Sequence, residues 1–210
     1  MKPTALLPPD ARLRIEGAIA DVERCTAGEI VAVVVAASAD YAHVPWRLGV
    51  LLAAAVCLGL PLLPFGVPIS ALFTAQFVAL VAGLALGRIP AVKHHLVPDV
   101  VQDAHVAERA RRSFAERGLA RTAARTGILI FVSILERSVV VLADEGIHRA
   151  LGPEERWEDV VELVLAGLRE GRAAEGLEAA VRRCGEILAA HVPPAQGNPD
   201  ELRDSVVLED

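Results

Sequence analysis

Acidic residues follow the second of two neighbouring apolar runs and form the first candidate site. In "SVVVLADEG", Asp144 and Glu145 precede Gly146, and Glu29 stands just before another apolar run. Carboxylates at strand ends can converge on one cation, and Ca²⁺ and Mg²⁺ prefer oxygen ligands. The sequence therefore predicts a metal site formed by Glu29, Asp144 and Glu145. The alternative is a solvated turn in which Gly146 supplies a positive φ.

Arginine and threonine side chains gather just before the first of the two runs, in "RTAARTG". Guanidinium and hydroxyl groups at the junction of a helix and a strand can hold a phosphate through bidentate hydrogen bonds. With a metal at Asp144, such a site would support phosphoryl transfer, with Asp144 and Arg125 as catalytic residues. The alternative is a helix end whose arginines interact with the helix dipole and with acids such as Glu116. The residues concerned are Arg121, Thr122, Arg125 and Thr126.

Several other chemistries find no support in the sequence. The six histidines show no HxxxH spacing and the three cysteines no CxxC spacing, which disfavours zinc. Ser133 lies inside an apolar run with no histidine near it in sequence, so a serine nucleophile is not indicated. A net charge of −6 disfavours nucleic-acid binding. We interpret Cys25 and Cys184 as small core residues in a reducing compartment.

The elements that would position these residues alternate between helix and strand. Residues 30–37, 128–135 and 139–143 are short runs rich in Val, Ile and Leu, which is typical of strands. The last two are separated by so few residues that they must form an antiparallel hairpin. Helical periodicity predicts four helices. They cover about residues 11–25, 99–117, 153–170 and 173–191.

The most apolar part of the chain lies between the first strand and the remaining elements. From Leu48 to Gly87, forty residues contain no Asp, Glu, Lys, Arg or His. As a helix this run would measure roughly 60 Å, or about two crossings of a bilayer. "GLPLLPFGVP" in its middle favours a tight turn. The sequence predicts a transmembrane helical hairpin within residues 46–88, and a soluble core helix pair is the less favoured alternative.

Small residues and basic flanks refine this hairpin. Gly49, Ala53 and Cys57 recur at every fourth position, and so do residues 75, 79, 83 and 87, so the two helices can pack closely. Arg47 precedes the apolar run, Arg88 and Lys93 follow it, and the turn carries no charge. The positive-inside rule then places the polar segments and both termini in the cytoplasm. The start of the chain lacks the continuous apolar core of a signal peptide.

The position of the hairpin predicts a discontinuous domain. One helix with one strand cannot bury its faces, and neither can a two-stranded ribbon. We therefore expect residues 30–37 to join the later strands in one small central sheet sandwiched by helices, an α/β fold. The soluble domain would comprise residues 11–40 and 97–195, interrupted by the hairpin at 46–88. Residues 196–210 would form an extended acidic tail.

The ordered set of segments resembles the TPM domain family. The segments are "TAGEIVAVVV", "LARTAARTGILIFVSILERSVVVLADEGI", a Trp at the start of the next helix, "GLEAAVRRCGEILAAHVP" and "NPDELRDSVV". The resemblance covers residues 11–40 and 97–210 and is nearest to bacterial members with a membrane hairpin inserted in the domain. It implies a central sheet between helices. It also implies divalent-cation binding, as in some members, and acid phosphatase activity, as proposed for plant members.

These observations lead to one expected function and two alternatives. The expected function is a module held at the bacterial inner (cell) membrane that binds Ca²⁺ or Mg²⁺. It would act on membrane-protein partners in assembly or quality control. The first alternative is a metal-assisted phosphatase-like hydrolase, and the second is a purely structural membrane subunit. In each case the lipid bilayer is one partner.

Overall fold

The computed structural model describes residues 2–62, 64, 66–151, 157–194 and 205–209. The chain divides into two compact units. The first contains residues 1–38 and 103–210, and the second contains residues 39–102. The first unit is therefore built from two separate stretches of sequence. Each unit is described here by itself.

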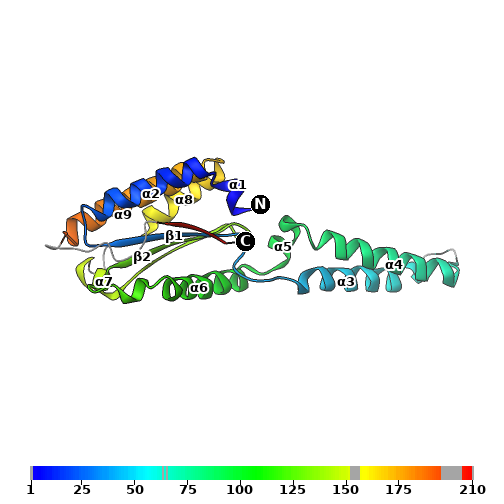
Figure 1. Ribbon diagram of the computed structural model, residues 1–210. Helices are drawn as coiled ribbons and strands as arrows, with labels where there is room; N and C mark the ends of the chain where they lie inside the picture. Colours follow the sequence, from blue (N-terminus) through cyan, green and yellow to red (C-terminus); the bar gives the residue numbers. More distant parts are fainter. Residues whose placement is uncertain (1, 63, 65, 152–156, 195–204, 210) are drawn as a thin grey trace. The chain divides into compact units, whose positions relative to one another are not determined.

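A mixed four-stranded sheet forms the centre of the first unit (Figure 1). The strands are β1 (Glu29–Val35), β2 (Gly127–Ser133), β3 (Ser138–Ala143) and β4 (Val206–Glu209), in the order β3-β2-β1-β4. β1 pairs parallel with β2 and β4, whereas β2 and β3 are antiparallel. The predicted pairing of the first strand with the later hairpin is confirmed, and so is the α/β fold class. The sequence analysis did not predict β4.

Helices cover both faces of this sheet (Figure 1). Helices α2 (Pro9–Glu23), α8 (Glu158–Arg169) and α9 (Ala173–His191) lie over one face. Helix α6 (Asp99–Glu116) and the short helix η2 (Leu119–Arg121) contribute apolar residues to the other face. Two further short helices are α1 (Pro3–Leu6) and α7 (Glu145–Leu151), and neither was predicted from the sequence.

The alternating directions of strand side chains explain why β1 is apolar from Ile30 to Val35. Ile30, Ala32 and Val34 belong to the larger core beneath α2, α8 and α9. Val31, Val33 and Val35 belong to the smaller core on the α6 side. Successive side chains of a strand point to opposite faces, so a central strand covered on both sides must be apolar at every position. All seven residues of β1 are buried.

The second unit contains a hairpin of two apolar helices. Its elements are α3 (His43–Gly59), η1 (Leu60–Leu62), α4 (Ile69–Leu86) and α5 (Pro90–Leu96). A Cβ on Gly83 would lie 2.5 Å from the Cα of Gly49, so the helices cross at this glycine pair. Residues 43–62 and 69–86 are long and apolar enough to cross a bilayer. Their large side chains face outward, which is not the pattern of a core helix pair: Leu58 is 74% exposed and Phe77 67%.

Candidate functional site

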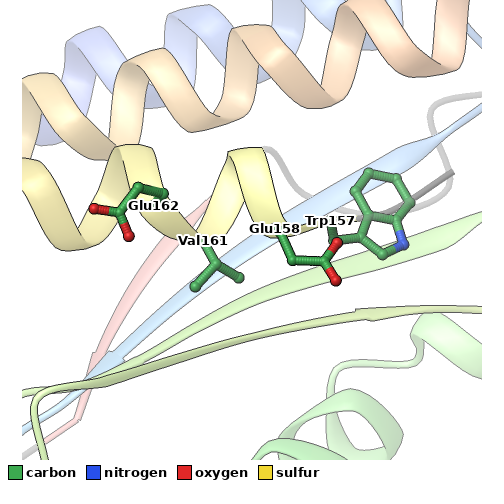
Figure 2. Close-up of a pocket in the computed structure, with 4 residues that line it drawn as sticks. All are labelled: Trp157, Glu158, Val161 and Glu162. Carbon is green, nitrogen blue, oxygen red and sulfur yellow. The ribbon is translucent and has the colours of Figure 1, made fainter.

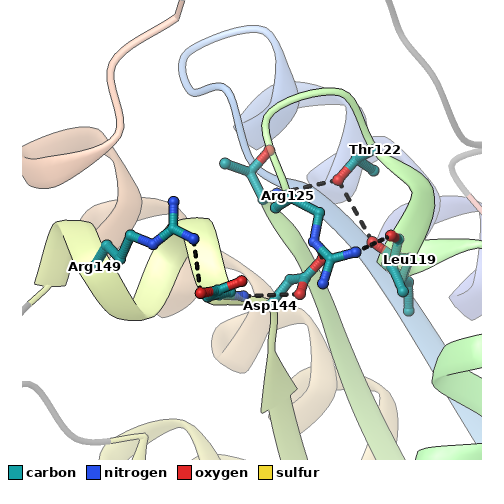
Figure 3. Close-up of polar contacts among 8 residues, drawn as sticks. Leu119, Thr122, Arg125, Asp144 and Arg149 are labelled. Atoms are coloured by element: carbon teal, nitrogen blue, oxygen red, sulfur yellow. Dashed lines mark hydrogen bonds and ion pairs between the residues drawn. The ribbon is translucent and has the colours of Figure 1, made fainter.

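Asp144 lies at the junction between β3 and α7 (Figure 3). Its backbone N–H donates to the carbonyl of Gly127 at 2.9 Å, which extends the pairing of β3 with β2 by one residue. Its Oδ1 accepts a 2.8 Å hydrogen bond from the backbone N–H of Glu145, and its carbonyl accepts from Ile147 and His148. Asp144 therefore ends a strand, starts a helix and is only 7% exposed.

Arg125 is the charged partner of Asp144 (Figure 3). Its Nε lies 3.1 Å from Asp144 Oδ2, and its Nη1 donates to the carbonyl of Ala120 at 2.7 Å. The Oδ2 atom is buried and is in ion-pair contact with Arg125, yet within the described part of the chain it accepts no well-aligned hydrogen bond. The backbone of Arg125 has a φ of 58°, a left-handed conformation that is uncommon for residues other than glycine. The predicted pair of Asp144 and Arg125 is thus in contact.

A close backbone approach holds the loop of Arg125 against α7. The N–H of Gly146 donates to the carbonyl of Arg125 at 2.9 Å. A Cβ on Gly146 would lie 2.3 Å from the carbonyl oxygen of Ala124 and 2.6 Å from that of Arg125. The alternative interpretation, a turn in which Gly146 supplies a positive φ, is wrong, because this residue lies inside α7 and its φ is not positive. Gly146 is needed because a side chain would collide with the neighbouring loop.

The threonines of the "RTAARTG" segment shape the same loop. Thr122 Oγ1 accepts from the N–H of Thr126 at 3.0 Å and donates to the carbonyl of Leu119 at 3.4 Å. Thr126 Oγ1 donates to the carbonyl of Ala27 at 2.6 Å. Both threonines are buried, so their hydroxyls hold the loop and do not face solvent. Arg121 is exposed. These contacts favour the structural interpretation of the two threonines over phosphate binding.

Glu145 belongs to the exterior of α7. It is exposed and forms a 2.7 Å ion pair with Arg149, one helical turn further on (Figure 3). The hydrogen bond from Arg149 and its positive charge lower the pKa of Glu145, and Arg125 adds a smaller effect in the same direction. The carboxylate next to Asp144 in sequence is therefore paired with a different arginine.

Glu29 lies in the same row of the sheet as Asp144 but on a different strand. Glu29 is opposite Gly127 on β2, and Asp144 bonds to Gly127 from the other side. The two residues are separated by two strand spacings, or roughly 10 Å between backbones. Leu119 fills the space over Gly127, where a Cβ would lie 2.5 Å from the Leu119 carbonyl oxygen. Glu29 is buried, at 3% exposure.

The described residues do not assemble into the predicted three-carboxylate metal site. No group of three His, Cys, Asp or Glu residues able to hold a metal ion occurs among them. Asp144 faces Arg125, Glu145 faces Arg149, and Glu29 lies two strands away. This arrangement does not fit Ca²⁺ or Mg²⁺ held by Glu29, Asp144 and Glu145 together. A cation bound near Asp144 stays a prediction, and we derive no catalytic step from it.

A polar network at the opposite end of β2 was not predicted. Ser38 Oγ donates to Ser133 Oγ at 2.9 Å, and Ser133 Oγ donates to the carboxylate of Glu136. The N–H of Ser38 donates to the same carboxylate at 3.0 Å. Ser133 is fully buried, in agreement with the view that it is no nucleophile. The signal in the sequence was a serine within an apolar strand followed three residues later by a glutamate.

Two further features lie apart from Asp144 and Ser133. Figure 2 shows an open depression at the start of α8, lined by Trp157, Glu158, Val161 and Glu162, none of which was a predicted site residue. Cys184 is buried, as expected, but Cys25 is exposed, so its interpretation as a core residue was wrong. Cys25 follows the end of α2, where the chain turns toward β1.

Comparison with known proteins agrees with the fold. A family model described as the TPM domain matches residues 91–187. The NMR structure of the BA42 protein from the psychrophilic bacterium Bizionia argentinensis is similar over 97% of this chain and 95% of that chain. Its TM-score is 0.59 and its sequence identity 17%. None of the curated proteins matches this chain.

These findings define the class of protein. The fold is an α/β sandwich, and a likeness at 17% identity supports the fold alone. The matched residues 91–187 include β2, β3 and helices α7 and α8, and thus Arg125 and Asp144. Residues 91–187 match the TPM domain family, and the resemblance inferred from the sequence is confirmed over this part of the chain.

Proposed function

We propose that this protein is a TPM-domain module anchored in the bacterial inner (cell) membrane by the α3–α4 hairpin. The observation that carries the proposal is the outward-facing apolar surface of α3 and α4. Leu58, Phe73 and Phe77 are each more than 60% exposed. Exposing so much apolar surface to water is unfavourable, whereas lipid chains match it. The glycine pair Gly49 and Gly83 supplies the close helix crossing typical of membrane helices.

The basic flanks support a cytoplasmic position for the soluble unit and both termini. Arg47 lies near the start of α3, and Arg88 and Lys93 follow α4. Lys and Arg next to membrane helices favour the cytoplasmic side. In this position the TPM domain would act on membrane-protein partners in assembly or quality control.

Two measurements test the anchor and its orientation. The full-length protein should remain in the membrane pellet after alkaline carbonate extraction. A double variant with Leu51→Arg and Phe77→Arg should shift to the soluble fraction, because both residues lie near the middle of the two spans and an arginine at the centre of a bilayer is costly. The matched control is Leu13→Arg, which changes an exposed apolar residue of the soluble unit. Release of the unmodified protein by carbonate would overturn the anchor.

A reporter fused after Asp210 tests the orientation. An alkaline phosphatase fusion should be inactive there and a green fluorescent protein fusion should be fluorescent, as expected for a cytoplasmic site. The opposite pair of signals would overturn the proposed orientation while leaving the anchor intact.

Divalent-cation binding is a second and narrower candidate function. The observation that favours it is the buried Asp144 Oδ2, which lacks a well-aligned hydrogen bond. Calorimetric titration of the full-length protein with Ca²⁺ or Mg²⁺ should show saturable heat that disappears in Asp144→Asn and persists in Glu145→Gln. Heat that is equal in all three proteins, or absent from all three, would remove the candidate.

Metal-assisted phosphatase activity is the remaining catalytic candidate. It rests on the contact between Asp144 and the half-exposed guanidinium of Arg125. Phosphomonoester hydrolysis with Mg²⁺ or Ca²⁺ should be lost in Asp144→Ala and in Arg125→Ala if this candidate is correct. Equal background rates in the variants and the unmodified protein would leave a structural or partner-binding role.

A further inference from the structure

The outermost strand, β4, is a short extended segment held by backbone pairing with β1 and by surrounding side chains. β4 has four residues, and its pairing with β1 runs from Ala32 opposite Val206 to Val35 opposite Glu209. The N–H of Ala36 adds a 2.9 Å hydrogen bond to the carbonyl of Glu209. β4 comes last in sequence, whereas its neighbour β1 comes first.

Arg109 of α6 and Arg117, the residue after α6, bind the glutamate at the end of this strand. Arg109 Nη2 contacts Glu209 Oε2, and Arg117 Nη2 contacts Glu209 Oε1. Each carboxylate oxygen thus has its own guanidinium group. Such charge-assisted hydrogen bonds are stronger than neutral ones and depend on the position of the carboxylate. Arg109 and Arg117 therefore specify an acidic residue at one position of the bound strand.

The other side of β4 is bound through its backbone. The N–H of Val206 donates to Glu16 Oε1 at 3.2 Å, and Arg12 Nη2 lies 3.5 Å from the carbonyl of Val206. Both side chains belong to α2. Backbone contacts of this kind hold any extended segment and carry little sequence information.

The side chains of β4 alternate as a strand requires. Val206 and Leu208 belong to the larger core, and Val207 packs against the smaller core on the α6 side. Glu209 points to the same face of the sheet as Val207, which agrees with its contacts with Arg109 and Arg117. The edge of β1 therefore accepts a strand with three apolar residues followed by an acidic residue.

A side chain of α2 accepts a backbone N–H on the same edge of β1. Ile30, like Ala36, directs its N–H toward the β4 side, since alternate residues of a strand share a direction. Within the described residues, the pairing of β4 begins opposite Ala32, and Glu23 Oε1 accepts the N–H of Ile30 at 2.7 Å. A side chain thus satisfies this N–H, and an uncovered Val-rich β1 would be an exposed edge strand.

We propose that the edge of β1, with Arg109 and Arg117, is a strand-addition site for extended protein segments of the pattern apolar–apolar–apolar–acidic. β4 is its intramolecular occupant. A partner segment of this pattern would bind by replacing β4 and would make the same backbone hydrogen bonds. The site does not depend on the membrane anchor, so it can fail while the proposed function holds.

The test uses the full-length protein in nanodiscs and a fluorescent peptide with the sequence of residues 205–210. An attached segment competes at an effective concentration in the millimolar range, so the peptide should bind weakly to the unmodified protein. Glu209→Gln in the protein weakens the attached strand, and the peptide should then bind about tenfold more tightly. A peptide with Gln in place of its Glu should not show this gain.

The arginines are tested in the same background. Adding Arg109→Ala and Arg117→Ala to Glu209→Gln should abolish the gain in peptide binding. The matched control, Arg111→Ala, changes an exposed arginine of the same helix and should leave the gain unchanged. Peptide binding that ignores the two arginines would overturn the proposal.

Hydrogen exchange identifies the binding surface and reports on folding. In Glu209→Gln the amides of Ala32, Val34 and Ala36 should exchange faster, and the peptide should restore their protection. Amides of β2 and β3 should stay protected in every variant, which shows that the sheet remains folded. Unchanged protection of the β1 amides together with no peptide binding would mean that β4 is a permanent strand, and the proposal would fall. A concentration-dependent dimer that forms between Glu209→Gln and the unmodified protein would identify the occupant as the same segment of a second copy, in place of a different partner.

Discussion

The two units of this chain place their apolar side chains in opposite ways. In the sheet unit Phe131, Ile130 and Leu188 are fully buried. In the hairpin unit Leu58, Leu62 and Phe77 are mostly exposed. The hydrophobic effect removes apolar groups from water wherever water is the solvent. The difference is the one expected if the hairpin unit meets lipid, as proposed, and composition alone does not reveal which apolar residues face outward.

Both units nevertheless use the same means of bringing two helices together. In the hairpin, Gly83 lies against Gly49. In the sheet unit, a Cβ on Gly167 would lie 2.7 Å from the Cα of Gly176, at the crossing of α8 and α9. Close glycine contacts are thus common to the two units, and only the outer surfaces of the helices differ.

The largest expected effect compares the two kinds of leucine. Leu188→Ala should lower the free energy of unfolding of the sheet unit by about 2–5 kcal/mol, because it leaves a cavity in a buried core. Leu58→Ala should leave that free energy unchanged. Urea unfolding of the protein in nanodiscs, followed by circular dichroism, measures both. Equal losses for the two variants would contradict the proposed difference in environment.

The glycine crossings give the next largest effect. Gly167→Val should destabilise the sheet unit by about 1–3 kcal/mol or more, since the added side chain meets backbone and not a flexible group. Gly83→Val should separate α3 from α4 and leave the sheet unit folded. Cysteine cross-linking across the hairpin and urea unfolding distinguish these outcomes. Loss of the folded sheet unit in Gly83→Val would show that the two units depend on each other.

A third comparison uses the cysteines. Burial raises the pKa of the Cys184 thiol to about 12. The unfolded thiol ionises near pH 8.5, so from there to about pH 12 only the unfolded state loses this proton. Stability is therefore retained below about pH 8.5 and falls by about 1.4 kcal/mol per pH unit above it.

The measurement is urea unfolding between pH 8 and pH 11. The unmodified protein should lose stability more steeply than Cys184→Ala over this range. A maleimide at pH 7 should label exposed Cys25 and leave Cys184 unlabelled until the protein unfolds. If the free energy of unfolding changed equally with pH in the two proteins, the raised pKa of Cys184 would be contradicted.

The smallest expected effect concerns the candidate site. Asp144→Ala removes the hydrogen bond to Glu145 N–H and the ion pair with Arg125, and should cost about 1–2 kcal/mol. Glu145→Ala breaks only an exposed ion pair and should produce no measurable change. Thermal unfolding measures which of the two variants loses more stability. An equal or greater loss in Glu145→Ala would mean that the two carboxylates have been assigned the wrong roles.

Much of the architecture could be predicted from local patterns. Val-rich runs indicated β1, β2 and β3, the uncharged run indicated the hairpin, and periodicity indicated α9 at residues 173–191, as observed. These features depend on hydrophobic patterning, which a sequence displays directly. The helix predicted at 153–170 is observed from Glu158, and its first residues lie outside the described part of the chain.

The candidate site was predicted less completely. The contact between Asp144 and Arg125 was expected. The ion pair of Glu145 with Arg149 and the position of Glu29 two strands away from Asp144 were not expected. The expected tail at 196–210 also differs, because residues 206–209 form β4. Residues 195–204 and 210 lie outside the description. Four residues give too short a pattern to predict a strand, and their pairing partner is more than 170 residues away in sequence.

The sequence by itself determined where apolar and polar segments lie, and hence the two units and the elements within them. Only the tertiary structure decided which charged groups meet. Asp144 with Arg125, and Glu209 with Arg109 and Arg117, come together through the register of the sheet and the packing of α6. Hydrophobic burial follows a local period that can be read along the chain, whereas an ion pair depends on the final positions of two distant segments.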